Sequence, residues 1–342
     1  MIQQKILVIQ TAFIGDLILT LPLIQVLNKE LNALVDVLCI PMTSSILQNN
    51  PYINEVIIYD KKGKDKGYAK IKRIINRIKY LRYDIIISPH RSLRSSFISY
   101  KSKAEKRISF DNSSFKFFYT DLVNYEKDKH EIIRNLSLLK PLGIERNHII
   151  KPELFPDEED RKTVDLLLKI LKVDIEKKFI TVAPGSEWLT KRFPEYKYIN
   201  LLKLLSERDI QIVLIGSKKD NELCSFIVDN CGSTNIKNAA GKLTLLQSAV
   251  MIGKSSLIIT NDSAPLHIAN AMNTRVFAIF GATIPEFGFY PIGDNDLIFE
   301  TKGLKCRPCG IHGGNKCPIK TLECMTQISE SEIAEHVIKS FI

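Results

Sequence analysis

Hydrophobic positions along the chain come in short continuous runs, separated by stretches in which apolar residues recur every three or four positions. The runs at 5–10, 35–40 and 84–88 are rich in Ile, Val and Leu and predict buried strands. The stretches at 17–31 and 68–82 predict amphipathic helices. Because the strand runs are continuous rather than alternating, we expect parallel sheets covered by helices on both faces.

The second half of the chain repeats this pattern. Strand runs stand at 179–183, 211–216, 257–260 and 276–281, and a helical stretch stands at 198–207. A chain of 342 residues is long enough for two domains of ordinary size. The predicted fold class is therefore α/β, with two Rossmann-like domains whose parallel sheets face each other across a cleft. Ligands of such sheets bind at the carboxyl ends of the strands.

An acidic, proline-flanked segment at 152–160 is the best candidate for the linker between these domains. It predicts an N-terminal domain at 1–155 and a C-terminal domain at 156–325, followed by a final segment at 326–342 that contains a short helix. The composition, with 45% hydrophobic and 25% charged residues, excludes a disordered or fibrous protein. Apolar runs are too short for a membrane span and no cleavable signal precedes the first strand, so we expect a soluble cytoplasmic protein.

The formal net charge of +10 is unevenly distributed. Residues 1–155 contain 25 basic and 15 acidic side chains, whereas residues 156–342 contain 23 of each. Residues 61–107 alone contain 16 basic and 3 acidic side chains, a field that attracts phosphate, anionic lipid or nucleic acid. Nucleic acid is the less favoured of these partners, because the segment lacks interleaved aromatic residues and a known reading motif.

The loop after the first strand contains Gly15-Asp16 and leads into a helical stretch. Glycine lets the backbone approach a ligand closely, and a helix N-terminus favours the ionised form of Asp16. An ionised carboxylate at a strand end is a candidate general base, although an aspartate that only caps a helix has the same pattern. No G-x-G-x-x-G follows this strand, so a dinucleotide cofactor is not expected.

Three loops of the second half contain candidate nucleotide-binding residues, although the first also fits an ordinary surface loop and the third also fits a capped helix with a packed histidine. One offers the Ser186 hydroxyl and the Lys191 ammonium, which suit a diphosphate. In another, Asp220 could accept hydrogen bonds from ribose hydroxyls. The third loop contains the six residues Asp262-Ser263-Ala264-Pro265-Leu266-His267. Asp262 or Ser263 would cap a helix here, and the N–H groups of its first turn would bind an anion.

Together these loops resemble those of glycosyltransferase family 9, the ADP-heptose:lipopolysaccharide heptosyltransferases, over nearly the whole chain. The resemblance implies the GT-B architecture of two facing Rossmann-like domains, and transfer of heptose to the lipopolysaccharide inner core with inversion and without a metal. It implies that Asp16, beside Gly15, is the general base. The usual glycine of the third loop is Ala264 here, which bears on how closely this backbone approaches the donor. The predicted donor-binding residues are Ser186, Lys191, Asp220, Asp262, Ser263, Ala264 and His267.

The resemblance extends to the acceptor side. Arg94 and Arg107 match the family's Arg-Ser and Arg-Ile-Gly-Phe segments, and their guanidinium groups would bind the anionic core sugars of the acceptor. Gly15 is also predicted to bind the acceptor. The basic helix at 68–82 should place its apolar stripe on the core, and its polar side could lie on anionic lipid. The C-terminal helix is expected to pack back toward the N-terminal domain, as in other GT-B enzymes.

Two patterns suggest a metal, and neither is adopted. Asp294-Asn295-Asp296 forms a D-x-D and is interpreted as a turn. A C-x2-C-x7-C-x6-C segment could bind zinc, but its spacing is not that of a zinc ribbon. Similar segments occur in the heptosyltransferase II branch of the family, which favours structural thiols and an enzyme of that type. The four cysteines are Cys306, Cys309, Cys317 and Cys324. We therefore expect neither a metal nor another cofactor.

The sequence thus predicts an inverting, metal-independent heptosyltransferase with ADP-heptose as donor and a lipid A–Kdo inner-core glycolipid as acceptor. We expect it to lie on the anionic cytoplasmic face of the inner membrane. One alternative is a family 9 enzyme that uses a different nucleotide-sugar for surface-glycan synthesis. Others are a polyanion-binding protein that uses residues 61–107 and a non-catalytic nucleotide sensor.

Overall fold

The computed structural model describes residues 3–61, 63 and 68–341. The chain separates into two compact units, residues 1–155 and 156–342, so that the boundary falls within the acidic segment. The acidic part of that segment is the first turn of helix α7 (Glu158–Ile170), where the Asp157 carboxylate accepts a hydrogen bond from the Asp160 N–H at 2.9 Å. Acidic residues gather there because they stabilise the positive end of the helix dipole.

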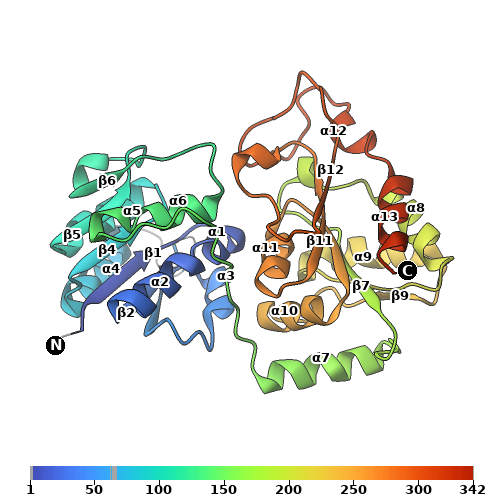
Figure 1. Cartoon of the computed structure of the whole chain (residues 1–342), viewed down its shortest axis with the longest axis horizontal. Coiled ribbons are helices and arrows are strands. Elements are labelled where there is room, and N and C mark those ends of the chain that lie inside the picture. Colours follow the sequence, from blue (N-terminus) through green and yellow to red (C-terminus); the bar gives the residue numbers. More distant parts are fainter. Residues whose placement is uncertain (1–2, 62, 64–67, 342) are drawn as a thin grey trace. The chain divides into compact units, whose positions relative to one another are not determined.

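A parallel sheet of six strands forms the centre of the first domain as far as it is described, in the order β3-β2-β1-β4-β5-β6 (Figure 1). This is the doubly wound Rossmann order, which reverses direction between β1 and β4. The strands are β1 (Lys5–Ile9), β2 (Leu34–Cys39), β3 (Glu55–Ile58), β4 (Ile85–Ser88), β5 (Lys106–Phe110) and β6 (Asp121–Val123). The helices are α1 (Ile14–Ile18), α2 (Leu21–Leu31), α3 (Pro41–Ser44), α4 (Tyr68–Leu81), α5 (Leu93–Ser102) and α6 (Glu131–Ser137), with the 3-10 turns η1 (Ser45–Leu47), η2 (Lys116–Phe118) and η3 (Lys140–Leu142).

The single helix predicted at 17–31 is in fact two helices, α1 and α2, separated by Leu19 and Thr20. Pro22, in the first turn of α2, is the physical reason, because its ring nitrogen has no hydrogen to donate to the carbonyl four residues earlier. As a result, α1 is a separate helix of one turn that follows β1 almost directly.

Helices α4 and α5 cover the same face of this sheet. Ile74, Ile75 and Ile78 of α4 and Ile98 of α5 are buried in one cluster with side chains of β1, β2 and β4. The prediction that the apolar stripe of α4 packs on the core is therefore confirmed for the side chains that the structure describes. The described basic side chains of α4, those of Lys72, Arg73, Arg77 and Lys79, are exposed to solvent.

The second domain repeats the Rossmann order, with its six described strands arranged as β12-β11-β10-β7-β8-β9, all parallel. The strands are β7 (Phe179–Ala183), β8 (Gln211–Leu214), β9 (Ile236–Asn238), β10 (Leu257–Asn261), β11 (Arg275–Phe280) and β12 (Leu297–Glu300). Besides α7, the helices are α8 (Glu195–Ser206), α9 (Asn221–Cys231), α10 (Leu245–Lys254), α11 (Ala264–Ala271), α12 (Glu323–Thr326) and α13 (Glu330–Lys339), with the 3-10 turns η4 (Leu189–Lys191), η5 (Lys218–Asp220) and η6 (Pro285–Phe287).

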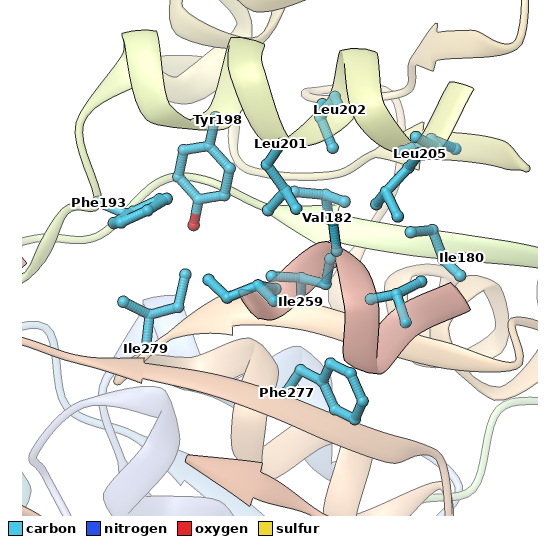
Figure 2. Close-up of a cluster of buried hydrophobic side chains, with 14 of the residues drawn as sticks. Ile180, Val182, Phe193, Tyr198, Leu201, Leu202, Leu205, Ile259, Phe277 and Ile279 are labelled. Carbon is cyan, nitrogen blue, oxygen red and sulfur yellow. The ribbon is translucent and has the colours of Figure 1, made fainter. Parts of the chain in front are cut away.

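The core of the second domain lies between α8 and the sheet. Figure 2 shows Leu201, Leu205 and Tyr198 of α8 directed toward Val182 of β7 and Ile259 of β10, and all five side chains are fully buried. Burying an aliphatic or aromatic side chain of this size stabilises the fold by roughly 1.5–3 kcal/mol. The same helix therefore anchors the polar loops at the ends of β7 and β10.

The C-terminal helix α13 packs on the core of the second domain. The expectation that it also packs toward the N-terminal domain stays a prediction. Ile333 and Val337 are completely buried in the core of the second domain. Glu330, in the first turn, forms an ion pair with Lys197 of α8 at 2.6 Å. The apolar face of α13 thus packs against α8 and the core of the second domain. No helix in the described ranges is long and apolar enough to span a bilayer.

Candidate active site

Asp16 lies in the first turn of α1, as predicted for the loop after β1. Its carboxylate accepts a hydrogen bond from the Phe13 N–H at 3.2 Å, which fixes the side chain at the N-terminus of the helix. Asp16 is half-buried, so its carboxylate is held by the protein and still reachable from solvent. Gly15 lies inside α1, in the helical conformation.

A histidine that is not among the residues predicted from the sequence lies against the same loop. The His90 Nδ1 atom is 2.8 Å from the Thr11 hydroxyl and 3.0 Å from the Ser95 hydroxyl. The Lys61 ammonium donates to the Thr11 carbonyl at 2.6 Å. Because β1 and β4 are neighbours in the sheet, the loops that follow them meet at one edge. A histidine directly after a strand, followed by hydroxyl residues, is the pattern that could have indicated it.

Burial lowers the pKa of the His90 imidazole to about 4, and the charges of Lys61 and Arg91 add to this effect. Between pH 4 and 6.5 the unfolded chain binds this proton and the native state does not, so stability rises with pH in that window. We expect wild-type protein to lose about 2 kcal/mol of unfolding free energy to this group between pH 7.5 and 5. Urea titrations at both pH values should show this loss, and His90→Gln should lack it.

The exposed His148 offers a matched control for that experiment. His148→Gln removes an exposed histidine and leaves His90 in place. Its unfolding free energy should therefore depend on pH as that of the wild type does. Equal loss of stability in wild type and His90→Gln between the two pH values would contradict the assignment to His90.

A buried ionic group lies behind Asp16. The Glu131 carboxylate is 2.7 Å from the Arg134 guanidinium, and it accepts a hydrogen bond from the Tyr125 hydroxyl at 3.3 Å. Burial raises the pKa of the Glu131 carboxyl, Arg134 opposes this, and the negative charge of Asp16 adds to the rise. The Arg91 guanidinium stacks over the Tyr125 ring at 4.1 Å. Asp16 therefore lies in a field of several fixed charges that the sequence alone did not indicate.

The two arginines predicted to bind the acceptor lie in different places. Arg94 is exposed in the first turn of α5, which follows β4, and thus lies at the same edge of the sheet as Asp16 and His90. Arg107 stands near the start of β5, paired with Ile86, toward the opposite edge. Its guanidinium donates to the carbonyls of Ala104 at 2.6 Å and Phe118 at 2.9 Å. The structure therefore does not bring Arg107 to the Asp16 loop, and its donors hold the backbone of neighbouring loops.

In the second domain, Lys191 and Asp262 come together from two of the predicted loops. The Lys191 ammonium lies 2.6 Å from the Asp262 carboxylate, and both side chains are largely buried. The Thr283 hydroxyl, after β11, donates to the same carboxylate at 2.6 Å. An ammonium fixed in this way next to the start of α11 can bind an anionic group through its remaining N–H donors.

Asn261, the last residue of β10, joins the loop after β7 to this site. Its side-chain amide donates to the Pro184 carbonyl at 2.9 Å and accepts from the Phe193 N–H at 3.0 Å. The buried Ser186 lies in the same loop, where its carbonyl accepts from the Arg192 guanidinium at 2.7 Å. Asn261 and Thr283 are not among the residues predicted from the sequence, because their role is to fix loops that are distant in the chain.

Asp220 closes the loop after β8. Its carboxylate accepts hydrogen bonds from the Ser217 N–H at 2.8 Å and the Ser217 hydroxyl at 2.7 Å. A Cβ atom at Gly185 would lie only 2.3 Å from this carboxylate, so a larger residue there would force the Asp220 side chain to move. The structure thus places Asp220 beside the loop that contains Ser186. One oxygen of the Asp220 carboxylate already accepts both hydrogen bonds from Ser217.

Ser263 is the N-cap of α11, although its side chain does not cap the helix. Ala264 is the first helical residue, where the backbone is right-handed and needs no glycine, so the methyl group causes no backbone strain. His267 is buried in the next turn. The predicted helix start is therefore confirmed, with Ser263 rather than Asp262 at the cap because Asp262 is taken up by Lys191.

The cysteine-rich segment lies against the loop that contains Lys191. Gly314 and Thr190 exchange two hydrogen bonds, at 2.8 and 3.0 Å. The Arg307 guanidinium donates to the Gly281 carbonyl at 2.6 Å and the Thr283 carbonyl at 2.8 Å. This segment therefore supports both the Lys191 loop and the Thr283 loop, and Arg307 is a further residue that the sequence did not indicate.

The four cysteines of this segment are free thiols that line a cavity of about 260 Å³. Backbone N–H groups, Leu322 first, lower the pKa of the Cys317 thiol, and burial raises that of Cys324 to about 11. Within the described ranges, no three His, Cys, Asp or Glu side chains are grouped so that they could hold a metal ion. The D-x-D is a turn, as predicted, because Asp296 accepts from the Gly293 N–H at 2.6 Å.

Two Rossmann-like sheets with polar loops gathered at their carboxyl ends are the framework of an α/β enzyme that binds a nucleotide. Residues 71–315 match the model of glycosyltransferase family 9 (heptosyltransferase). The chain belongs to this family and is a glycosyltransferase.

Similar proteins are found among characterised enzymes and solved structures. Lipopolysaccharide heptosyltransferase 2 of Salmonella typhimurium is 27% identical, over 83% of this chain and 84% of that protein. Lipopolysaccharide heptosyltransferase 3 of Escherichia coli is 29% identical, over 84% of this chain and 85% of that protein. The structure of E. coli ADP-heptose lps heptosyltransferase II superimposes with a TM-score of 0.81 at 22% identity, covering 99% of this chain and 98% of that one. The predicted α/β class and GT-B architecture are thereby confirmed.

Proposed function

We propose that this protein transfers heptose from ADP-heptose to the inner core of lipopolysaccharide. The observation that supports this most directly is the buried Lys191–Asp262 pair beside the start of α11, in a chain of the heptosyltransferase family. The two named relatives are lipopolysaccharide heptosyltransferases, and the name of the solved structure includes ADP-heptose, which supports both proposed substrates. The enzyme would act on the cytoplasmic face of the inner membrane, where such a glycolipid acceptor is anchored.

Asp16 is the proposed general base. The acceptor hydroxyl gives its proton to the Asp16 carboxylate while its oxygen forms a bond to the anomeric carbon of the heptose. The bond between that carbon and the diphosphate breaks, and ADP leaves with the electron pair. A single displacement of this kind inverts the anomeric configuration. Gly15 and Arg94 would bind the acceptor near Asp16, and Arg107 would act only through the loops that it supports.

Lys191 is proposed to stabilise the charge that develops on the departing diphosphate. An ammonium has three N–H donors, so Asp262 can hold Lys191 through one of them while others bind phosphate oxygens. The remaining donor site would consist of Ser186, Ser263, the Ala264 N–H and His267, with Asp220 toward the ribose.

We propose that the transfer needs no metal ion, because Lys191 and the start of α11 would take the place of a divalent cation. Treatment with excess EDTA is therefore expected to leave turnover within about twofold of the untreated enzyme. EDTA removes metal ions but leaves Lys191 and the start of α11 to stabilise the departing diphosphate. ADP release before and after treatment measures this. A loss of activity that Mg²⁺ or Zn²⁺ restores would contradict it, and one equivalent of zinc in purified protein would assign the cysteines to a metal.

Release of ADP from ADP-heptose in the presence of Kdo2-lipid A, or of the same acceptor bearing one heptose, tests the proposed function. A panel of UDP-, GDP- and dTDP-sugars tests the alternative donor. Turnover only with another nucleotide-sugar would show that ADP-heptose is not the donor, while the assignment to glycosyltransferase family 9 would stand. Absence of any turnover, together with salt-dependent binding of an oligonucleotide, would favour the polyanion-binding alternative.

A further inference from the structure

One surface of the first domain exposes several aromatic rings side by side. Tyr100 of α5 and Phe115 and Phe117 at η2 are 45%, 48% and 72% exposed. The Phe118 ring joins them, with its centroid 4.5 Å from Tyr100, 5.6 Å from Phe115 and 4.8 Å from Phe117. We refer to these four residues as the aromatic cluster. Large apolar side chains grouped on a surface mark a site that binds a membrane, another protein or a ligand.

The backbone of the aromatic cluster is fixed by hydrogen bonds. The Arg107 guanidinium donates to the Phe118 carbonyl at 2.9 Å, and the Ser114 N–H donates to the Arg91 carbonyl at 3.0 Å. Phe115 adopts a left-handed backbone with φ of 53°, which a bulky residue maintains only where its surroundings hold it. The rings are therefore presented to solvent by a firmly held turn.

Cations lie at the aromatic cluster and near it in the chain. The Lys101 ammonium lies 5.4 Å from the centroid of the Tyr100 ring, and Lys103 and Lys116 are exposed nearby in the chain. Helix α4 packs beside α5 on the same face of the sheet, so the outer sides of both helices belong to one layer (Figure 1). Together α4 and α5 contain seven basic and no acidic residues. This layer therefore attracts anions over its whole outer side.

We propose that the aromatic cluster and the outer sides of α4 and α5 dock the first domain on an anionic lipid bilayer. Aromatic rings enter the boundary between headgroups and acyl chains while lysines meet the anionic headgroups, which is the composition of an interfacial membrane-binding surface. A second copy of this chain would bring two cationic layers together. Nucleic acid would need open ring faces, whereas Tyr100 and Phe118 already stack on each other.

This inference rests on the proposed function for the membrane-anchored acceptor, but lipid binding is measured without any transfer. In flotation with vesicles, wild-type protein is expected to bind phosphatidylcholine–phosphatidylglycerol vesicles at least ~10-fold more tightly than pure phosphatidylcholine vesicles. The double variant Phe115→Ser/Phe117→Ser should lose ~10-fold or more of that binding, because two rings no longer enter the interface. Lys101→Glu/Lys116→Glu should lose at least as much.

Leu166→Ser/Ile170→Ser is the matched control, since it removes two exposed apolar side chains of 59% and 65% exposure from α7 of the other domain. It should bind vesicles like the wild type. Equal binding of vesicles by the wild type and the Phe115/Phe117 variant overturns the proposal. It is also overturned if the wild type binds an oligonucleotide or a second copy of itself and the Phe115/Phe117 variant has lost that binding.

ADP release with a delipidated core oligosaccharide separates this inference from the proposed function. The Phe115/Phe117 variant should keep that turnover within about twofold of the wild type, because the aromatic cluster contacts only the lipid phase. Normal turnover without vesicle binding by the wild type overturns the docking surface alone. Vesicle binding as predicted, in an enzyme that transfers no heptose to any acceptor, supports the docking surface and overturns the proposed function.

Discussion

Asp16→Asn is expected to reduce kcat by about 100-fold or more while ADP and ADP-heptose still bind, because an amide cannot accept the acceptor proton. The asparagine keeps the size of the side chain and an oxygen that can accept from the Phe13 N–H, so the turn of α1 should persist. Steady-state ADP release gives kcat, and calorimetric titration of ADP gives the affinity of the donor site.

Asp160 in the second domain has the same capping position as Asp16. It lies in the first turn of α7, and its carboxylate accepts from the Asp157 N–H at 3.3 Å. Asp160→Asn should therefore reproduce any loss of stability from weakened capping, about 1 kcal/mol, without loss of turnover. A kcat within threefold of the wild type for Asp16→Asn would remove the general-base role, and a parallel fall in both variants would show that capping rather than catalysis is affected.

Lys191→Ala is expected to reduce kcat by roughly 100- to 1,000-fold, the usual consequence of removing one group that stabilises charge in a transition state. It should also destabilise the protein by about 3 kcal/mol, because the carboxylate of Asp262 remains buried without its ammonium. Turnover assays and urea denaturation measure these two effects separately.

The two effects of Lys191→Ala can be separated by a second change. Adding Asp262→Asn removes the unpaired buried charge and should restore much of the stability, while turnover stays low. Lys254→Ala is the matched control, since Lys254 forms an ion pair with Asp165 at 2.8 Å that is about half exposed. Exposed pairs contribute at most about 1 kcal/mol, so this control should change neither quantity much. Recovery of turnover in the Lys191/Asp262 double variant would exclude the proposed role of Lys191.

Much of the fold follows from local sequence patterns. Continuous apolar runs correctly predicted β1, β7 and β10, because a strand buried on both faces must be apolar throughout. The edge strands β6 and β12 were not predicted, since they are short and only partly buried. The break between α1 and α2 was also missed, although Pro22 was visible, because apolar periodicity continues across it.

The candidate site was predicted in part. Asp16, Lys191 and Asp262 stand at strand ends, where parallel sheets place their ligand-binding loops, and the structure finds them there. His90 and Thr283 were missed because each acts through a residue far away in the chain, Thr11 and Asp262. Arg107 was predicted to bind the acceptor from its motif alone, whereas strand register decides its position near the start of β5.

By itself, the sequence determined the α/β class, most of the buried strands, the location of the surplus positive charge in the first domain, and several of the polar residues that follow strands. These are local properties, set by apolar periodicity, charge and the chemistry of helix starts. Only the tertiary structure decided which polar residues meet. The loops of Asp16 and His90 adjoin because β1 pairs with β4, and Lys191 reaches Asp262 because β7 pairs with β10. Such pairings depend on crossover connections between distant strands, and no local pattern encodes them.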